Sequence, residues 1–148
     1  MDAKHKDQID ILSFSQSWIN TYNPEYGGGG GSGKVTCGAI TLMKNIDKSS
    51  PMLIKQVVMG THIPTATISF VATDPRLGVT GEYYTITLND VLVNELTQTD
   101  AQDPNRIFEK LVLNAASHEF KYVSVNTKGQ TIGSPVSFKY DCKTSTGG

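Results

Sequence analysis

The sequence predicts a mainly β fold, namely a small β-barrel or two-sheet sandwich with one short flanking α-helix at about residues 51–59. Two observations carry this prediction. Apolar and polar residues alternate with a period of two along most of the chain, as they do in strands with one buried face. Glycine, proline, asparagine or aspartate separates most of the alternating segments, which is typical of short strands joined by turns. Several such strands with one helix favour a barrel or a sandwich.

Residues 9–18 are the first expected strand. Because successive strand side chains point to opposite sides of a sheet, this segment has an apolar face and a serine face. The apolar face carries Leu12, Phe14 and Trp18, and the serine face carries Ser13, Ser15 and Ser17. We expect the apolar face to belong to the core and the serine face to point outward.

The same alternation continues along the rest of the chain. The further expected strands are residues 35–46, 65–73, 82–96, 107–125 and 135–142.

One segment breaks the alternation and predicts a helix. Ser50 can accept a hydrogen bond from the first-turn amides, and Pro51 suits the first helical position because the amide hydrogen it lacks would be unpaired there. Gly60 supplies a left-handed residue that ends the helix. Leu53 and Val57 are the expected buried stripe, with Ile54 and Val58 as further candidates for it.

A glycine-rich loop separates the first two strands. It runs from Tyr22 through Tyr26 to Lys34, and its run of consecutive glycines is Gly27, Gly28, Gly29, Gly30 and Gly31. Residues 28–34 also spell G-x-x-x-x-G-K, close to the phosphate-binding P-loop. That mechanism needs a Ser or Thr after the lysine and a following helix. Position 35 is Val35 and a strand is expected there, so we predict no nucleotide site.

Composition bounds the remaining function classes. The chain has 148 residues and a net charge of -1, which suits one folded domain and does not favour binding to a nucleic-acid backbone. A net charge so close to zero does not oppose self-association. No apolar stretch is long enough for a membrane helix, and the charged N-terminus does not resemble a secretory signal. We expect no membrane insertion and no general secretion signal.

The titratable and nucleophilic residues form no recognisable catalytic or metal-binding pattern. The three histidines, His5, His62 and His118, share no short metal-ligand spacing. Cys37 and Cys142 are far apart in the chain, which favours two buried reduced thiols and leaves a disulfide open. We therefore predict no catalytic residue, no cofactor and no metal site.

Five segments together resemble one family. The opening DAKHKDQIDILSFS (residues 2–15) is similar to the D-x-K-H-K-x-x-I-x-V-L-S-W-S pattern of Hcp proteins, the tube proteins of bacterial type VI secretion systems. The glycine run ending in residues 33–35 resembles their glycine-rich loop. Similar matches follow in order at KNIDKSSP (44–51), GTHIPTA (60–66) and YTITLNDVLV (84–93).

This resemblance implies a β-barrel subunit that assembles into hexameric rings, which stack into a tube. Sheath contraction would propel the tube with its tip protein, and effectors would travel in its lumen. The protein would be assembled in the bacterial cytoplasm and secreted without a signal peptide. In that setting we expect Ser13, Ser15 and Ser17 to face the lumen, and the loop with Tyr22, Tyr26 and residues 27–31 to contact the next ring. A specialised Hcp-like cargo chaperone and a stand-alone β-sandwich binding module are the alternatives.

The sequence also departs from the family pattern. Phe14 and Gln16 replace the tryptophans of the family's W-S-W segment, and a strand usually found before the D-x-K-H motif is expected to be absent here. We expect one domain over residues 1–142 and a disordered tail over residues 143–148.

Overall fold

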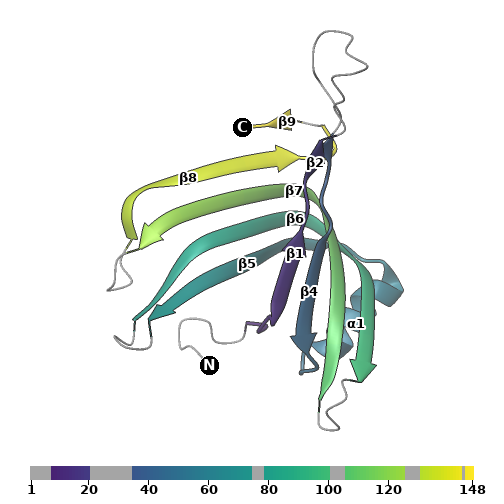
Figure 1. Ribbon diagram of the computed structural model, residues 1–148. Coiled ribbons are helices and arrows are strands. Elements are labelled where there is room, and N and C mark those ends of the chain that lie inside the picture. The colour runs from purple at the N-terminus through teal and green to yellow at the C-terminus, as the bar shows by residue number, and fades with distance from the viewer. Residues whose placement is uncertain (1–7, 21–34, 75–78, 101–105, 126–130, 145) are drawn as a thin grey trace. The chain divides into compact units, whose positions relative to one another are not determined.

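The computed structural model describes residues 8–20, 35–74, 79–100, 106–125, 131–144 and 146–148 (Figure 1). The predicted mainly β class is confirmed, with one α-helix among the described residues. In chain order the elements are β1 Ser13–Gln16, β2 Ile19–Asn20, β3 Val35–Thr36, β4 Ile40–Asn45, α1 Ser50–Met59, β5 Ile63–Asp74, β6 Val79–Asp100, β7 Ile107–Val125, β8 Thr131–Asp141 and β9 Thr146–Gly147. Each predicted strand has a counterpart in this set.

The chain forms two compact units, and β6 and β7 are long enough to contribute one end to each. Unit 1 comprises residues 1–62 and 92–114, and unit 2 comprises residues 63–91 and 115–148. The prediction of a single domain over residues 1–142 stays a prediction.

In unit 1 the strand order is β1-β4-β7-β6, and β2 pairs with β3 in a separate two-stranded sheet. Strand β4 alternates between buried and half-buried side chains, so its inward face carries Ile40, Leu42 and Lys44. Leu42 lies opposite Leu111 of β7, which continues the apolar face on the next strand. The core of this unit consists of Ile40, Leu42, Val93, Leu111 and Leu113.

In unit 2 the strand order is β5-β6-β7-β8-β9. Its buried apolar side chains are Ile86, Leu88 and Val91, all on β6. The register shifts between β5 and β6 at Phe70/Val71, and between β7 and β8 at Tyr122/Ser124. Such bulges bend a strand and change the direction of its side chains.

Helix α1 begins as predicted but is not capped by Ser50. Ser49 is the N-cap residue and makes no side-chain cap hydrogen bond, while Pro51 lies in the first turn as expected. Ser50 is buried, and its hydroxyl bonds Glu109 instead. The cap prediction is wrong because the sequence alone cannot show that a buried carboxylate competes for this hydroxyl. Gly60 ends the helix with φ 63°, as predicted.

The expectation that the apolar face of the first strand belongs to the core is also wrong for two of its three residues. Phe14 is half-buried, but Leu12 is 56% exposed and Trp18 38% exposed. Strand β1 covers Ser13–Gln16, so Leu12 and Trp18 lie outside the strand, although the Leu12 amide still donates to the Met43 carbonyl of β4 at 2.7 Å. Gln16 donates a hydrogen bond to the Gly38 carbonyl at 2.9 Å, a contact the tryptophan of the family pattern would not make in this form.

The tail was expected to be disordered, but its described part is folded. Residues Thr146–Gly147 form β9, which pairs with Tyr140 and Asp141 of β8. The polar, glycine-containing tail has no periodicity of its own, and its order comes from the neighbouring strand edge. Sequence patterns do not show such an edge.

Candidate interaction surfaces

A buried polar cluster in unit 1 joins β4, β6, β7 and the start of α1. Lys44 Nζ lies 2.5 Å from Glu109 Oε2, and both side chains are fully buried. Ser50 Oγ donates to the same oxygen at 2.8 Å, while Gln98 Nε2 donates to Glu109 Oε1 at 2.8 Å. Lys44 also reaches Asp47 Oδ1 at 3.1 Å. The carboxylate of Glu109 therefore accepts hydrogen bonds from three side chains.

These contacts determine the ionisation of Glu109. Burial alone raises the pKa of this carboxyl, but the hydrogen bonds from Lys44, Gln98 and Ser50 outweigh it and hold the pKa below its usual value. The carboxylate of Glu109 stays charged at neutral pH. Since neither charged side chain is exposed, we interpret the cluster as a device that positions the helix start against the sheet, and not as a site open to substrate.

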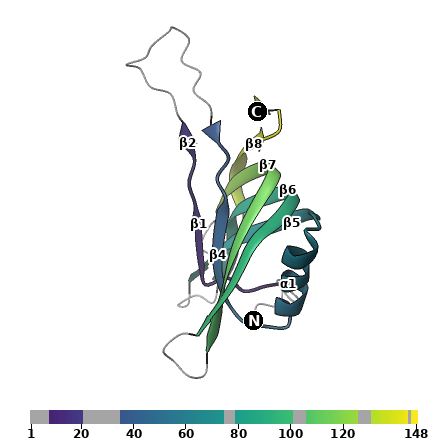
Figure 2. The ribbon, with the colours of Figure 1, turned by 90° about the vertical axis from the view of Figure 1, so that its right-hand side faces the viewer.

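The outer side of α1 is unusually apolar for a surface helix. Leu53, Gln56 and Val57 are half-buried on the inner side. The outer side is turned away from the strands of unit 1 (Figure 2) and carries four large apolar side chains. These are Met52 at 58%, Ile54 at 39%, Val58 at 75% and Met59 at 63% exposure, so Ile54 and Val58 do not belong to the buried stripe. Lys55 is the one charged residue of the helix. A surface of this kind marks an interaction site more often than a solvated face.

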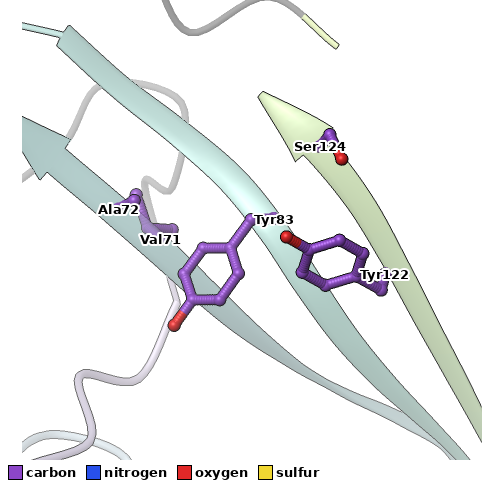
Figure 3. A pocket seen from close by; sticks show the side chains of 5 residues that line it. All are labelled: Val71, Ala72, Tyr83, Tyr122 and Ser124. Carbon is purple, nitrogen blue, oxygen red and sulfur yellow. The ribbon is translucent and has the colours of Figure 1, made fainter. Parts of the chain in front are cut away.

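Unit 2 contains a shallow groove of about 520 Å³ lined by Val71, Ala72, Tyr83, Tyr122 and Ser124 (Figure 3). The rings of Tyr83 and Tyr122 meet edge to face, with centroids 6.5 Å apart. Both register shifts of this unit fall at the groove. Between β5 and β6 the shift skips Tyr83, and between β7 and β8 it falls beside Tyr122. The bulges therefore direct both tyrosines into the groove.

The three predicted lumen residues lie on β1 or directly after it. Ser13 and Ser15 are exposed on one face of this strand, and Ser17 is exposed just after it. The predicted ring contact and the P-loop-like segment fall on residues 21–34, outside the described residues. The assignment of the serines to a lumen and of the loop to a ring contact stays a prediction.

The histidine and cysteine expectations have separate outcomes. His62 is exposed between α1 and β5, whereas His118 is 1% exposed. Burial lowers the pKa of His118, and a hydrogen bond with the backbone of Ala115 opposes this change. Cys37 and Cys142 are both disulfide-bonded, so the expectation of two reduced thiols is wrong. Distance along the chain gave no indication of the bond.

The buried ion pair was missed from the sequence, although a signal for it exists. Lys44 follows Ile40 and Leu42 at every second position, and Glu109 precedes Leu111 and Leu113 in the same way. Opposite charges at inward positions of two strands indicate a buried pair, because a lone charge is too costly there.

Comparison with known proteins assigns the family. Residues 1–126 match the family described as type VI secretion system effector, Hcp. The chain is 31% identical over 142 residues to protein hcp1 of Pseudomonas aeruginosa, covering 96% of this chain and 86% of that protein. The chain belongs to the Hcp family. Its membership agrees with the motifs of residues 2–15, 44–51, 60–66 and 84–93.

Solved structures of Hcp proteins share this fold. A structure of a type six secretion system protein aligns with a TM-score of 0.87 at 21% identity, covering 100% of this chain and 91% of that chain. Hcp2 from Salmonella typhimurium aligns with a TM-score of 0.67 at 24% identity, covering 99% and 88%. A type VI secretion system effector from Yersinia pestis aligns with a TM-score of 0.69 at 23% identity, covering 95% and 89%. Among the described residues, no helix is both long and apolar enough to cross a membrane.

Proposed function

We propose that this Hcp-family chain is a structural subunit of the inner tube of a type VI secretion system. Its copies form hexameric rings, the rings stack into a tube, and sheath contraction propels the tube. The chain catalyses no reaction and uses no cofactor in this role. It is assembled in the bacterial cytoplasm and leaves the cell as part of the tube. Its partners are further copies of itself, the tip and sheath proteins, and effectors in the lumen.

The observation that carries the proposal is the apolar outer side of α1. Met52, Val58 and Met59 are all more than half exposed, which leaves apolar area in water unless another molecule covers it. Burying a side chain of this size on association contributes roughly 1.5–3 kcal/mol. A tube subunit has neighbours both within its ring and in the next ring, so such a surface has a use in that setting.

The lumen and the ring contact keep the assignments made from the sequence. The exposed hydroxyls of Ser13 and Ser15 support a polar wall along which different cargo proteins can pass without strong contacts. The loop with Tyr22, Tyr26 and the glycines of residues 27–31 is the proposed contact between stacked rings, because glycine permits close approach of two backbones.

The test is the mass and shape of the purified protein and of one helix variant. We expect light scattering to give the mass of a closed ring and negative-stain images to show rings and stacks. Val58→Asp places a charge in the apolar outer side of α1 and should reduce assembly at equal concentration. Lys55→Gln changes the charge of the same helix without adding a charge to the apolar residues, so it should assemble normally. A protein that stays monomeric at high micromolar concentration would refute the proposal.

The tyrosine groove favours a second candidate, a binding module or cargo chaperone. Two tyrosines meeting edge to face offer apolar faces and hydroxyls to a bound side chain. On that reading the protein is a monomer that binds a peptide, and Tyr122→Ala abolishes binding without changing the mass. If rings of the Tyr122→Ala variant assemble normally, ring assembly does not depend on the groove, and this result distinguishes the two functions.

A further inference from the structure

The outer edge of β8 can be read from its hydrogen bonds. The amide of Cys142, directly after β8, donates to the Ala116 carbonyl of β7 at 2.8 Å, while the amide and carbonyl of Lys139 bond Gly148 on the other side. Backbone groups alternate between the two sides of a strand. Lys139 and Ser137 therefore direct their backbone groups away from β7. Within the described residues, β9 is the only strand on that side of β8.

We call residues 146–148 the strap, because they cover one end of this edge (Figure 1). The Lys139 amide donates to the Gly148 carbonyl at 3.0 Å, and the Gly148 amide donates to the Lys139 carbonyl at 2.9 Å. Gly147 approaches the ring of Phe138 so closely that a Cβ at this position would lie 2.7 Å from Phe138 Cζ. The strap thus occupies the edge at Lys139, Tyr140 and Asp141.

The turn before the strap is held by side-chain contacts. Asp141 Oδ1 accepts hydrogen bonds from the amides of Lys143 at 2.9 Å and Thr144 at 3.1 Å. Lys143 Nζ also lies 3.2 Å from Asp90 Oδ2 of β6. The hydroxyls of Thr144 and Thr146 are 2.6 Å apart, which connects the turn to the strap. These contacts hold the strap in one register on β8.

The uncovered part of the edge is short and self-complementary. Pro135 has no amide hydrogen and lies where the register of β8 with β7 shifts, so the regular edge ends at this residue. Between Pro135 and Lys139, the outward backbone pair is that of Ser137. Val136 and Phe138 flank it on one face of the strand and are 69% and 49% exposed. In an antiparallel pair of two β8 strands centred on Ser137, each Val136 lies opposite the other copy's Phe138. Cross-strand pairs of this type are stabilising.

We propose that the strap and Pro135 together prevent β8 from pairing with β8 of a second copy of this chain. The exposed β8 edge is a latent two-fold contact, and the strap keeps it closed by occupying Lys139 and sterically blocking the approach of another strand. If copies of the chain assemble through other surfaces, pairing of β8 with β8 would link one assembly to another. The inference does not depend on the proposed tube function, since it concerns the edge in any oligomeric state.

The test compares the full chain with a chain truncated after Thr144. Amide exchange at Lys139 reports whether the edge is open, and exchange at Ser137 reports whether a second strand pairs with it. In the truncated chain we expect fast exchange at Lys139 in dilute solution, and protection of Ser137 that grows with concentration. The mass by sedimentation should shift toward twice that of the full chain's own species, with association at least about tenfold tighter.

Three further variants make the result decisive. Gly148→Ala keeps both backbone bonds and meets nothing within 4 Å, so it should behave as the full chain does. Pro135→Thr in the truncated chain restores a backbone amide at the end of the edge and should tighten pairing further, whereas Val136→Lys in the truncated chain should abolish it. The proposal is overturned if Lys139 stays protected after truncation. It is equally overturned if Lys139 opens while mass and Ser137 exchange stay unchanged. A monomeric full chain contradicts the tube proposal and leaves this comparison intact.

Discussion

The two units differ in which unusual side chains their strands carry: buried charged residues in unit 1 and exposed aromatic residues in unit 2. In unit 1, Lys44 and Glu109 are charged and yet fully buried. In unit 2, Tyr122 and Phe138 are aromatic and yet 48% and 49% exposed. Unit 1 thus holds an internal interaction that specifies how a helix meets a sheet. Unit 2 has apolar side chains that become fully buried only if another molecule covers them.

This contrast separates residues that specify the fold from residues available for contacts. A buried ion pair gives little net stability, but it strongly penalises any arrangement that separates the partners. An exposed aromatic side chain adds little to the subunit's own stability and can contribute substantially to an interface. Substitutions at the buried ion pair should therefore change folding, whereas substitutions at the exposed aromatic side chains should change association.

The largest expected effect is on the buried pair. Lys44→Met removes the ammonium and leaves Glu109 buried without its charged partner, so we expect a loss of about 3–5 kcal/mol in the free energy of unfolding. Lys110 and Glu95 form a matched exposed pair in the same unit, 3.3 Å apart with side chains 45% and 48% exposed. Lys110→Met should cost at most about 1 kcal/mol. Urea unfolding of both variants measures the difference, and equal losses would contradict the structural role of the buried cluster.

A smaller effect is expected from Ser50→Ala. This change removes the 2.8 Å hydrogen bond to Glu109 and leaves the carboxylate with one fewer donor, at an expected cost of about 1–3 kcal/mol. Ser49→Ala alters the N-cap residue, whose side chain makes no cap hydrogen bond, and should cost less than about 0.5 kcal/mol. Urea melts that rank the two serines the other way would show that Ser49 stabilises the helix start and that the Ser50–Glu109 contact contributes little.

Most of the fold could be predicted from the sequence, but little of these interaction surfaces could. Alternation identified the strands, and the proline and Gly60 marked the two ends of the helix, because such signals are local. The role of Ser50, the disulfide and the ordered tail depend on residues distant in the chain, which one sequence does not bring together. The exposed side of α1 was hidden for another reason: Met52, Ile54 and Val58 are as apolar as core residues, and periodicity alone cannot tell which apolar face is covered.

The smallest expected effect is a difference in acid sensitivity between the units. Burial lowers the pKa of His118, so its contribution to stability is complete above its ordinary pKa of 6.5 and is lost as the pH falls below that value. The pKa of Glu109 is held below its ordinary value of 4.5, so its contribution persists until the pH falls below that range. Between these two values unit 2 should weaken while unit 1 does not, at a rate of no more than about 1.4 kcal/mol per pH unit for one proton.

Amide exchange, corrected for its intrinsic pH dependence, can follow both units in one sample. We expect the protection of Ile86 and Leu88 in unit 2 to fall below pH 6.5, and that of Leu42 and Leu111 in unit 1 to persist to about pH 4.5. His118→Gln removes the titrating imidazole and should flatten the response of unit 2 alone. Parallel loss in both units across this range would show that His118 does not govern the difference. Earlier loss in unit 1 would show that the contacts around Glu109 do not keep its carboxylate ionised.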